Sequence, residues 1–182
     1  MAGSYLDVIN AQTELSFVPP QNFYMAVEKL PSTSFMLQRI QIPVLSGDEM
    51  PMSTAMNPGH TMMPGTGMEY SVLSADFILD KHFKNYKEVL QWFKNNYAPD
   101  DKALQAVSWT DQMSNITVIG TDSGNTPVCH WNFIDCFPIS MDGPMFDATM
   151  PDVEYLTSNV TFRFKYFTFS TYTNGTDNHD DI

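Results

Sequence analysis

The chain has 182 residues, of which 43% are apolar and 13% aromatic, with a formal net charge of −12 and a pI near 4.4. This length and apolar content predict one domain with a full hydrophobic core. With 9 Lys and Arg in total, the composition argues against nucleic-acid binding by phosphate neutralisation, which needs clustered basic residues.

Membrane insertion and secretion are not expected. No apolar run approaches the roughly 20 residues of a membrane helix, and residues 1–11 lack the basic region and apolar core of a signal peptide. Cys129 and Cys136 fall in one predicted strand with opposite parity, so they would face opposite ways and lie ~23 Å apart at ~3.3 Å per residue. We therefore predict two free thiols in cytosol-like conditions.

Residues 1–21, with Pro19 and Pro20 near their end, predict an N-terminal arm that is either extended or a short docked helix. The next two segments, 22–30 and 34–45, are rich in Phe, Met, Val and Ile. They flank Pro31, Ser32 and Thr33, and this pattern predicts a β-hairpin. Pro43 removes a backbone donor and predicts the end of pairing or a sheet edge.

Residues 46–68 contain 6 Met, 3 Pro and 4 Gly without a helical or strand period, so we predict a long loop. Thioether side chains adapt to irregular surfaces, and long loops in compact domains usually have a function. The sequence therefore favours a loop that packs on a partner through Met50, Met52, Met56, Met62 and Met63. Two alternatives remain: a disordered spacer, and a Cu(I) site formed by these thioethers with His60, which predicts stoichiometric metal in the purified protein.

Residues 69–80 alternate as a strand, with Leu73, Ala75 and Phe77 on the more buried face. A helix over about 85–97 follows, with Asn85 as its N-cap and Glu88 as the capping-box partner. The apolar stripe of this helix is expected to pack on the sheet and consists of Tyr86, Val89, Leu90, Phe93 and Tyr97.

After a connector at 100–114, residues 116–120 and 128–137 predict a hairpin around a turn-rich segment. On its second strand, His130 and Asn132 share one face, and the other face carries Cys129, Trp131, Phe133 and Phe137. The segment 158–169 predicts the clearest strand, with Val160, Phe162, Phe164 and Tyr166 toward the core. Arg163 and Lys165 lie on its opposite face, where acidic neighbours could meet them. Residues 174–182 predict a mobile acidic tail, which leaves 22–173 as the domain.

Catalytic and metal-binding patterns are absent from the sequence. The 4 His are scattered, the 2 Cys have no zinc-type spacing, and no glycine cluster joins a strand to a helix. Adjacent strand residues face opposite ways, so Cys129 and His130 cannot readily form a nucleophile pair. We predict a protein that is not an enzyme and uses no cofactor or metal.

Three phrases occur in a fixed order along residues 22–169. The first is Phe35, Gln38, Ile42 and Pro43; the second is LSADFILDKHFKNYKEVLQWF, a strand that runs into a helix. The third is FPIS followed by a turn and the strand ending VTFRFKY. In this order they resemble the tail tube proteins of contractile-tailed bacteriophages.

The resemblance implies a mainly β fold, in which two packed antiparallel sheets with one flanking helix form a β-barrel-like subunit. It also implies hexameric rings that stack into a tube, with sheath, baseplate and tape-measure proteins as partners. DNA would pass through the lumen without specific binding, and an acidic wall would repel its phosphates. The protein would then be a virion tail component assembled in the host cytoplasm.

Candidate residues for the channel wall lie on the polar side of the inner strands: Gln41, Ser74, Asp76 and Asn132. A tube-initiating or tube-terminating ring, and the inner tube of a type VI-like injection system, are alternatives within the same architecture. The copper-binding protein is the alternative of another class.

Overall fold

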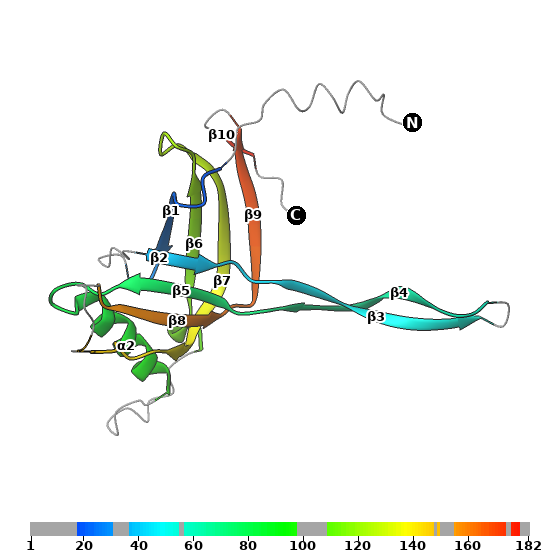
Figure 1. Ribbon diagram of the computed structural model, residues 1–182, viewed down its shortest axis with the longest axis horizontal. Coiled ribbons are helices and arrows are strands. Elements are labelled where there is room, and N and C mark those ends of the chain that lie inside the picture. The colour runs from blue at the N-terminus through cyan, green and yellow to red at the C-terminus, as the bar shows by residue number, and fades with distance from the viewer. Residues whose placement is uncertain are drawn as a thin grey trace.

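The computed structural model describes residues 18–30, 37–54, 57–97, 109–147, 149, 155–173 and 176–178. Most of the N-terminal arm, the 31–33 turn and the end of the acidic tail lie outside these ranges. None of the helices in the described residues is long and apolar enough to cross a membrane. The elements are β1 (Phe23–Val27), β2 (Leu37–Gln41), β3 (Leu45–Thr54), β4 (Asn57–Tyr70), β5 (Leu73–Ile78), α2 (Lys84–Tyr97), α3 (Trp109–Gln112), β6 (Ser114–Thr121), β7 (Pro127–Met141), β8 (Thr157–Arg163), β9 (Tyr166–Thr173) and β10 (Thr176–Asn178) (Figure 1).

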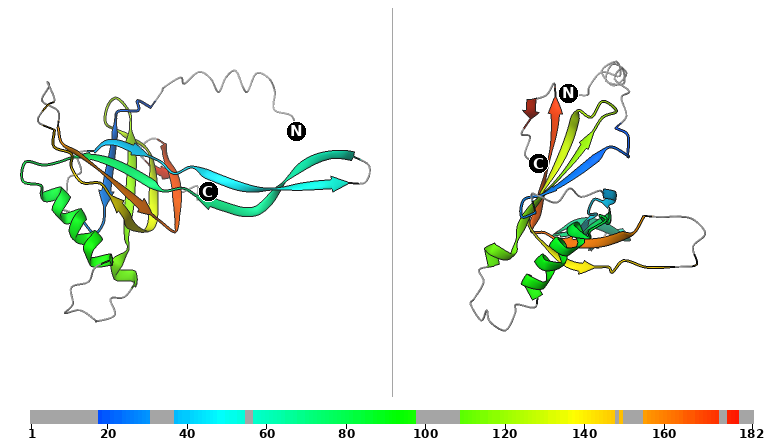
Figure 2. Two further views of the ribbon diagram at one scale, coloured as in Figure 1. Left: turned by 60° about the horizontal axis from the view of Figure 1, so that its bottom comes forward. Right: turned by 90° about the vertical axis from the view of Figure 1, so that its left-hand side faces the viewer.

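Two antiparallel sheets share the long strand β7. Its first half pairs with β6 and β9, and with β1 and β10 these strands form the first sheet. Its second half pairs with β8, which continues through β5 to β2 as the second sheet. The strands of the two sheets cross at a steep angle, and α2 lies beside the second sheet (Figures 1 and 2). The predicted mainly β fold with one flanking helix is confirmed.

A β-bulge lets β7 serve both sheets. Ser114 is in register with Cys136 and Ile116 with Phe133, so β7 contains one more residue than β6 between these pairs. Asp135, inside this interval, has a φ of 56°, in the left-handed region that Asp enters more readily than most residues. The extra residue bends the strand and changes which parity faces inward.

The bulge makes the predicted placement of Cys136 wrong. Cys136 and Phe133 are both fully buried in the core, whereas strict alternation would put Cys136 outside. Both thiols are free, as predicted, and Cys129 is also buried. Burial raises the pKa of the Cys136 thiol to about 12, so the thiolate form is scarce at neutral pH.

The segment predicted as one strand over 158–169 is two strands in different sheets. Val160 and Phe162 on β8 are fully buried, as expected. The chain then crosses between the sheets at Phe164 and Lys165, where the Lys165 N–H donates to Ile134 O at 3.0 Å. Because β9 begins in the other sheet, the alternation of buried and exposed side chains along β8 does not continue into β9. Tyr166 is therefore 43% exposed instead of lying in the core.

The predicted hairpin between residues 22–30 and 34–45 is wrong. Strand β1 pairs with β6, and β2 pairs with β5. This arrangement places Met25 opposite Val118 and Val27 opposite Ile116, so that four buried apolar side chains meet on one face. Burial of these side chains stabilises the distant pairing more than a short turn could.

Helix α2 begins at Lys84, close to the predicted start, but Asn85 has a different role from a capping-box residue. Asn85 is buried, and its side-chain amide donates to Ile78 O at 2.9 Å. Its Oδ1 accepts from the N–H groups of Asp80 at 3.3 Å and Tyr86 at 2.9 Å. The side chain therefore fixes the start of the helix to the end of β5.

The buried face of α2 differs from the predicted stripe. Val89 and Trp92 are buried, whereas Tyr97 is 53% exposed. The Trp92 ring lies 5.8 Å from the Phe162 ring between centroids, and its Nε1 donates to Gln112 O at 2.9 Å. The indole can therefore be buried because its single donor has a partner.

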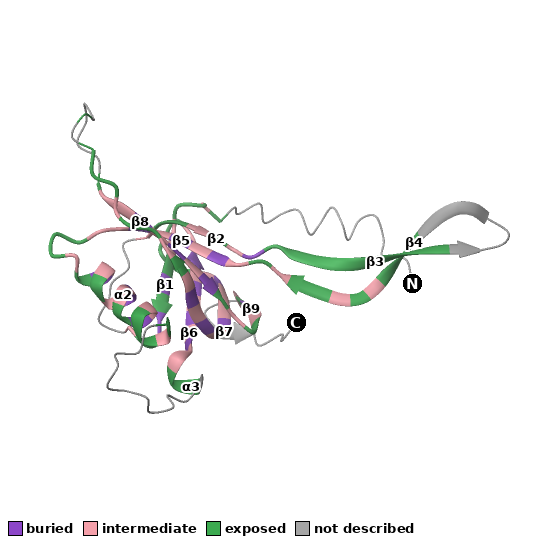
Figure 3. Ribbon diagram, turned by 90° about the horizontal axis from the view of Figure 1, so that it is seen from below, coloured by how far each residue is buried: buried purple, intermediate pink, exposed green. Residues whose placement is uncertain are grey.

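The core fills the space between the two sheets and α2 (Figure 3). The predicted inner face of β5 is confirmed, since Leu73, Ala75 and Phe77 are fully buried. The other buried hydrophobic members of the core are Met25, Val27, Val89, Trp92, Ile116, Val118, Phe133, Cys136, Val160 and Phe162.

Candidate assembly surfaces

A two-stranded hairpin projects far from the body of the subunit (Figures 1 and 2). Strands β3 and β4 pair only with each other among the described residues, and they leave the second sheet between β2 and β5. The prediction of a loop over residues 46–68 is therefore wrong. Each strand of a two-stranded ribbon has a free edge, so prolines such as Pro51 and Pro64 can be accommodated without losing a ladder bond. We call residues 45–70 the Met-rich hairpin.

Glycines allow the two strands of the hairpin to approach closely near its base. The register shifts between Gly47 and Glu49, where the single residue Asp48 lies opposite residues 65–67, so the bulge is on β4. A Cβ atom on Gly65 would lie 2.8 Å from the backbone oxygen of Asp48, closer than real Cβ contacts. The bulge therefore requires glycine at Gly65 and Gly67, because a Cβ atom at either position would clash with Asp48. The same glycines interrupt the alternating pattern by which a strand is predicted from sequence.

Apolar side chains of the hairpin are exposed to solvent. Met50, Met52, Met62 and Met63 are 46–57% exposed, and Met68 is 60% exposed. Met50 is directly opposite Met63, with Met52 on the same face, whereas Met62 is opposite Pro51 on the other face. The structure thus brings together four of the predicted interface residues. Met56 and the His60 side chain lie outside the described parts, so the copper site stays a hypothesis.

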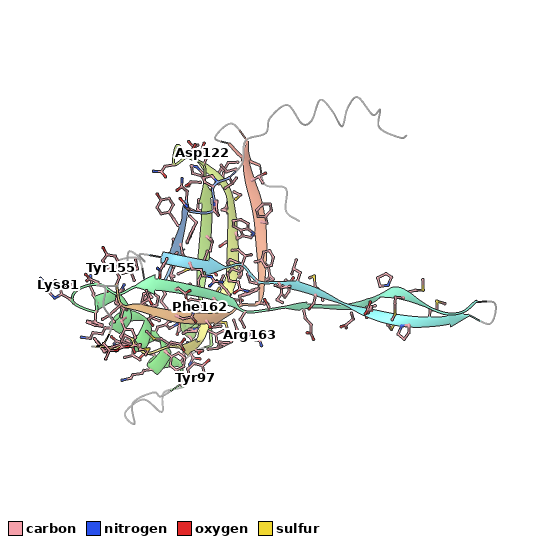
Figure 4. All side chains as sticks on the ribbon, viewed as in Figure 1. Lys81, Tyr97, Asp122, Tyr155, Phe162 and Arg163 are labelled. Atoms are coloured by element: carbon pink, nitrogen blue, oxygen red, sulfur yellow. The ribbon has the colours of Figure 1, made fainter. Side chains whose placement is uncertain are left out.

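Arg163 and Lys165 are both exposed, and Arg163 lies near the base of the hairpin (Figure 4). Lys165 Nζ lies 3.8 Å from Asp135 Oδ2 of the same chain. Arg163 lines an open pocket of about 380 Å³ together with Glu69, Tyr70, Ser71 and Phe164. Both cations therefore already have acidic residues of their own subunit nearby.

The outward face of the second sheet is polar. Ser74 is in register with Gln41 and Thr161, and Asp76 with Arg39 and Asn159. The Asn159 amide donates to Ser74 Oγ at 2.8 Å and also to Asp76 Oδ1. Three of the predicted channel-lining residues, Gln41, Ser74 and Asp76, thus share one polar face.

Asn132 lies elsewhere, on the first sheet, where its Oδ1 accepts from Thr117 Oγ1 at 3.2 Å. The structure therefore does not place it with Gln41, Ser74 and Asp76. The charged residues that strand alternation puts on the outward face of the second sheet are Arg39, Asp76 and Arg163. This face is not acidic, in contrast to the chain as a whole.

A basic surface that sequence reasoning missed lies on α2. Lys84, Lys87 and Lys94 are exposed on one side of the helix at spacings of 3 and 7, and exposed Lys81 precedes it. These are 4 of the 9 basic residues of the chain. The signal was present in the sequence as a local excess of Lys in an otherwise acidic chain.

The sequence matches the family described as T4-like virus tail tube protein gp19 over residues 19–168. The chain belongs to this family. The predicted resemblance over residues 22–169 is confirmed, and the family is one of structural tube proteins. None of the curated proteins matches the sequence.

Solved structures of contractile injection systems share the fold. A chain of the PVC sheath-tube complex of an extracellular contractile injection system in the extended state is 16% identical, with a TM-score of 0.63 over 94% of this chain and 100% of that one. A chain of the PVC sheath/tube terminator is 19% identical, with a TM-score of 0.63 over 84% and 96%. A chain of the anti-feeding prophage cap, described as a tube-terminating cap, is 18% identical, with a TM-score of 0.61 over 86% and 92%.

Proposed function

We propose that six copies of this chain close into a ring and that the rings stack into the tail tube through which the phage genome leaves. The family match supports this proposal. Strand β2 lies at one end of the second sheet and β1 at one end of the first. Exposed strand edges are a liability in a monomer, and ring closure pairs them with a neighbouring copy.

The observation that carries the proposal is the Met-rich hairpin. Its strands pair only with each other among the described residues, and its thioethers are about half exposed. Exposed apolar side chains that gather on one projecting element are typical of an interaction site. We assign it to contact with an adjacent copy, around the ring or in the next ring, through Met50, Met52, Met62 and Met63.

The polar outward face of the second sheet is our candidate for the channel wall, with Gln41, Ser74 and Asp76 on it. Asn159 joins Ser74 to Asp76 by hydrogen bonds, and the charges of Arg39, Asp76 and Arg163 on this face nearly balance. Such a wall offers DNA phosphates little to bind, so the genome slides past. Low adhesion, instead of repulsion by an acidic wall, accounts for passage without specific binding.

The same proposal gives the partners and the location. Sheath, baseplate and tape-measure proteins would contact the assembled tube, which forms in the host cytoplasm and ends in the virion tail. A ring that begins or terminates a tube is the second candidate, because the similar structures include a sheath/tube terminator and a tube-terminating cap.

Reversing the charges of Arg163 and Lys165 to Glu is expected to weaken assembly far more than folding. Both side chains are exposed, and an exposed ion pair such as Lys165–Asp135 contributes at most ~1 kcal/mol. We therefore expect the free energy of unfolding in urea to change by less than ~1 kcal/mol, while light scattering shows fewer tubes. Unchanged tube formation would remove these two residues from the interface.

Mass photometry of the purified chain tests the ring. We expect a species of six times the chain mass at low concentration and larger multiples of it as the concentration rises. Dimers or trimers as the limiting species would contradict a six-membered ring. A single ring species that never stacks would favour the tube-terminating candidate.

A further inference from the structure

The exposed side of α2 combines positive charge with aromatic surface. Lys84, Lys87 and Lys94 lie on this side, and Lys81 precedes them. The acidic residue in this helix, Glu88, is partly buried, with a side-chain exposure of 23%, and lies 3.9 Å from Lys84 Nζ. We call these four lysines the lysine face.

Aromatic rings adjoin the lysine face toward the end of the helix. Tyr97 is 53% exposed and packs against Phe93 with ring centroids 4.7 Å apart. Lys94 and Tyr97 are three residues apart and therefore lie on the same side of the helix. A partner for this surface must bring acidic groups together with apolar groups that pack well on aromatic rings.

The Met-rich hairpin has this combination. Between residues 44 and 70 the sequence contains Asp48, Glu49 and Glu69 but no Lys or Arg. Exposed Met50, Met52 and Met63 add thioethers on one face, and thioether sulfur makes favourable contacts with aromatic rings. Charge and side-chain chemistry are therefore complementary between the hairpin and the lysine face.

One subunit cannot make this contact with itself. The hairpin projects from the side of the molecule opposite to α2, and Lys81 lies at the far end from the hairpin (Figures 1 and 4). We propose that the Met-rich hairpin of one copy docks on the lysine face of another copy. The contact is heterologous, because two different surfaces meet, and it therefore propagates along a ring or a stack of rings.

Other exposed surfaces fit the hairpin less well. Met145 and Phe146, in the segment between β7 and β8, are 75% and 73% exposed, but Asp142 and Asp147 flank them. Acidic residues there would repel the acidic hairpin. The lysine face combines aromatic surface with unbalanced positive charge, so it is the surface that the observations favour.

The inference rests on the proposed function, and a charge-swap experiment tests it separately. The first variant carries Lys84→Glu, Lys87→Glu and Lys94→Glu; the second carries Glu49→Lys and Glu69→Lys, which leave Asp48 and the bulge opposite it unchanged. Each variant alone places like charges at every contact, and we expect the concentration needed for tube assembly to rise at least ~10-fold. The increase should be smaller in high salt, because salt screens exposed charges.

Complementation decides the outcome. An equimolar mixture of the two variants restores opposite charges at every contact between unlike copies, and a single chain with both sets of changes restores them between identical copies. We expect both to form tubes near the wild-type concentration. Asp142→Lys with Asp147→Lys is the matched control, which should not rescue the lysine variant.

Two results would overturn the docking contact. One is normal assembly of either variant alone. If the lysine variant forms normal tubes but no longer binds another tail protein, the lysine face serves that protein and not the hairpin. The other is failure of both the mixture and the doubly changed chain, with circular dichroism showing that every variant is folded. In either case wild-type rings and tubes would still support the proposed function, which fails only if the wild-type chain does not assemble.

Discussion

Removal of the Met-rich hairpin is expected to abolish tube formation and to leave the subunit folded. The variant replaces residues 48–67 with Asn-Gly between Gly47 and Met68, which are register partners and can flank a two-residue turn. The hairpin contributes no residue to the buried core, so the free energy of unfolding should change by less than ~1 kcal/mol. Electron microscopy should show no tubes at concentrations where the wild-type chain forms them.

A full-length variant separates the role of the thioethers from that of the hairpin backbone. Met50, Met52, Met62 and Met63 are replaced by Ser, which keeps the strand pairing but removes the apolar contact. We expect this variant to assemble at least ~10-fold less readily than the wild-type chain, because each buried apolar side chain contributes about 1.5–3 kcal/mol. Tubes of normal stability from the shortened variant would show that the hairpin is not an assembly element.

Phe162→Ala is expected to lower the free energy of unfolding by about 3–5 kcal/mol. Phe162 is fully buried on β8, opposite Leu73 of β5 and Pro138 of β7, and its ring lies beside Trp92. Truncation removes the contact between Phe162 and Trp92 of α2 and leaves a cavity. Since domains are typically stable by 5–15 kcal/mol, this loss is a large fraction of the total.

Phe146→Ala is the matched control for Phe162→Ala, because the same truncation occurs at a side chain that is 73% exposed. Its effect on the free energy of unfolding should stay within about 0.5 kcal/mol. Urea denaturation followed by tryptophan fluorescence measures both variants. Similar losses for the two would contradict the assignment of Phe162 to the core.

Alternation along the strands predicted much of the core correctly. Leu73, Ala75 and Phe77 on β5, and Val160 and Phe162 on β8, follow a period of two and are buried as expected. These strands pair on both sides, so their inner face is set by burial over several residues. Patterns of this kind report the local environment directly.

Patterns failed where the backbone departs from regularity. The bulge at Asp135 and the crossing at Phe164 each change the parity that faces the core, and neither leaves a clear mark in the sequence. As a result, alternation predicts Cys136 on the face opposite Cys129 and Tyr166 in the core, whereas Cys136 is buried with Phe133 and Tyr166 is exposed. A one-residue irregularity moves every later side chain to the other face, so strand prediction loses its accuracy beyond that point.

Of the candidate surfaces, the sequence predicts the Met residues of the hairpin but neither the hairpin itself nor the lysine face. The Met residues of the hairpin stood out by composition, although the hairpin itself was hidden by its glycines and prolines. The lysine face lies outside the apolar stripe predicted for the helix, so the apolar pattern did not reveal it. Asn85 is buried, and its side chain makes three hydrogen bonds with backbone groups. A capping pattern in the sequence does not predict these contacts with the end of β5.

Assembly into stacked rings is the central claim, and negative-stain electron microscopy of the purified wild-type chain tests it most directly. We expect end views of six-fold rings with a central channel and side views of tubes built from regularly stacked rings. A stable monomer at all concentrations, with no rings in the images and no high-mass species in solution, would contradict the account.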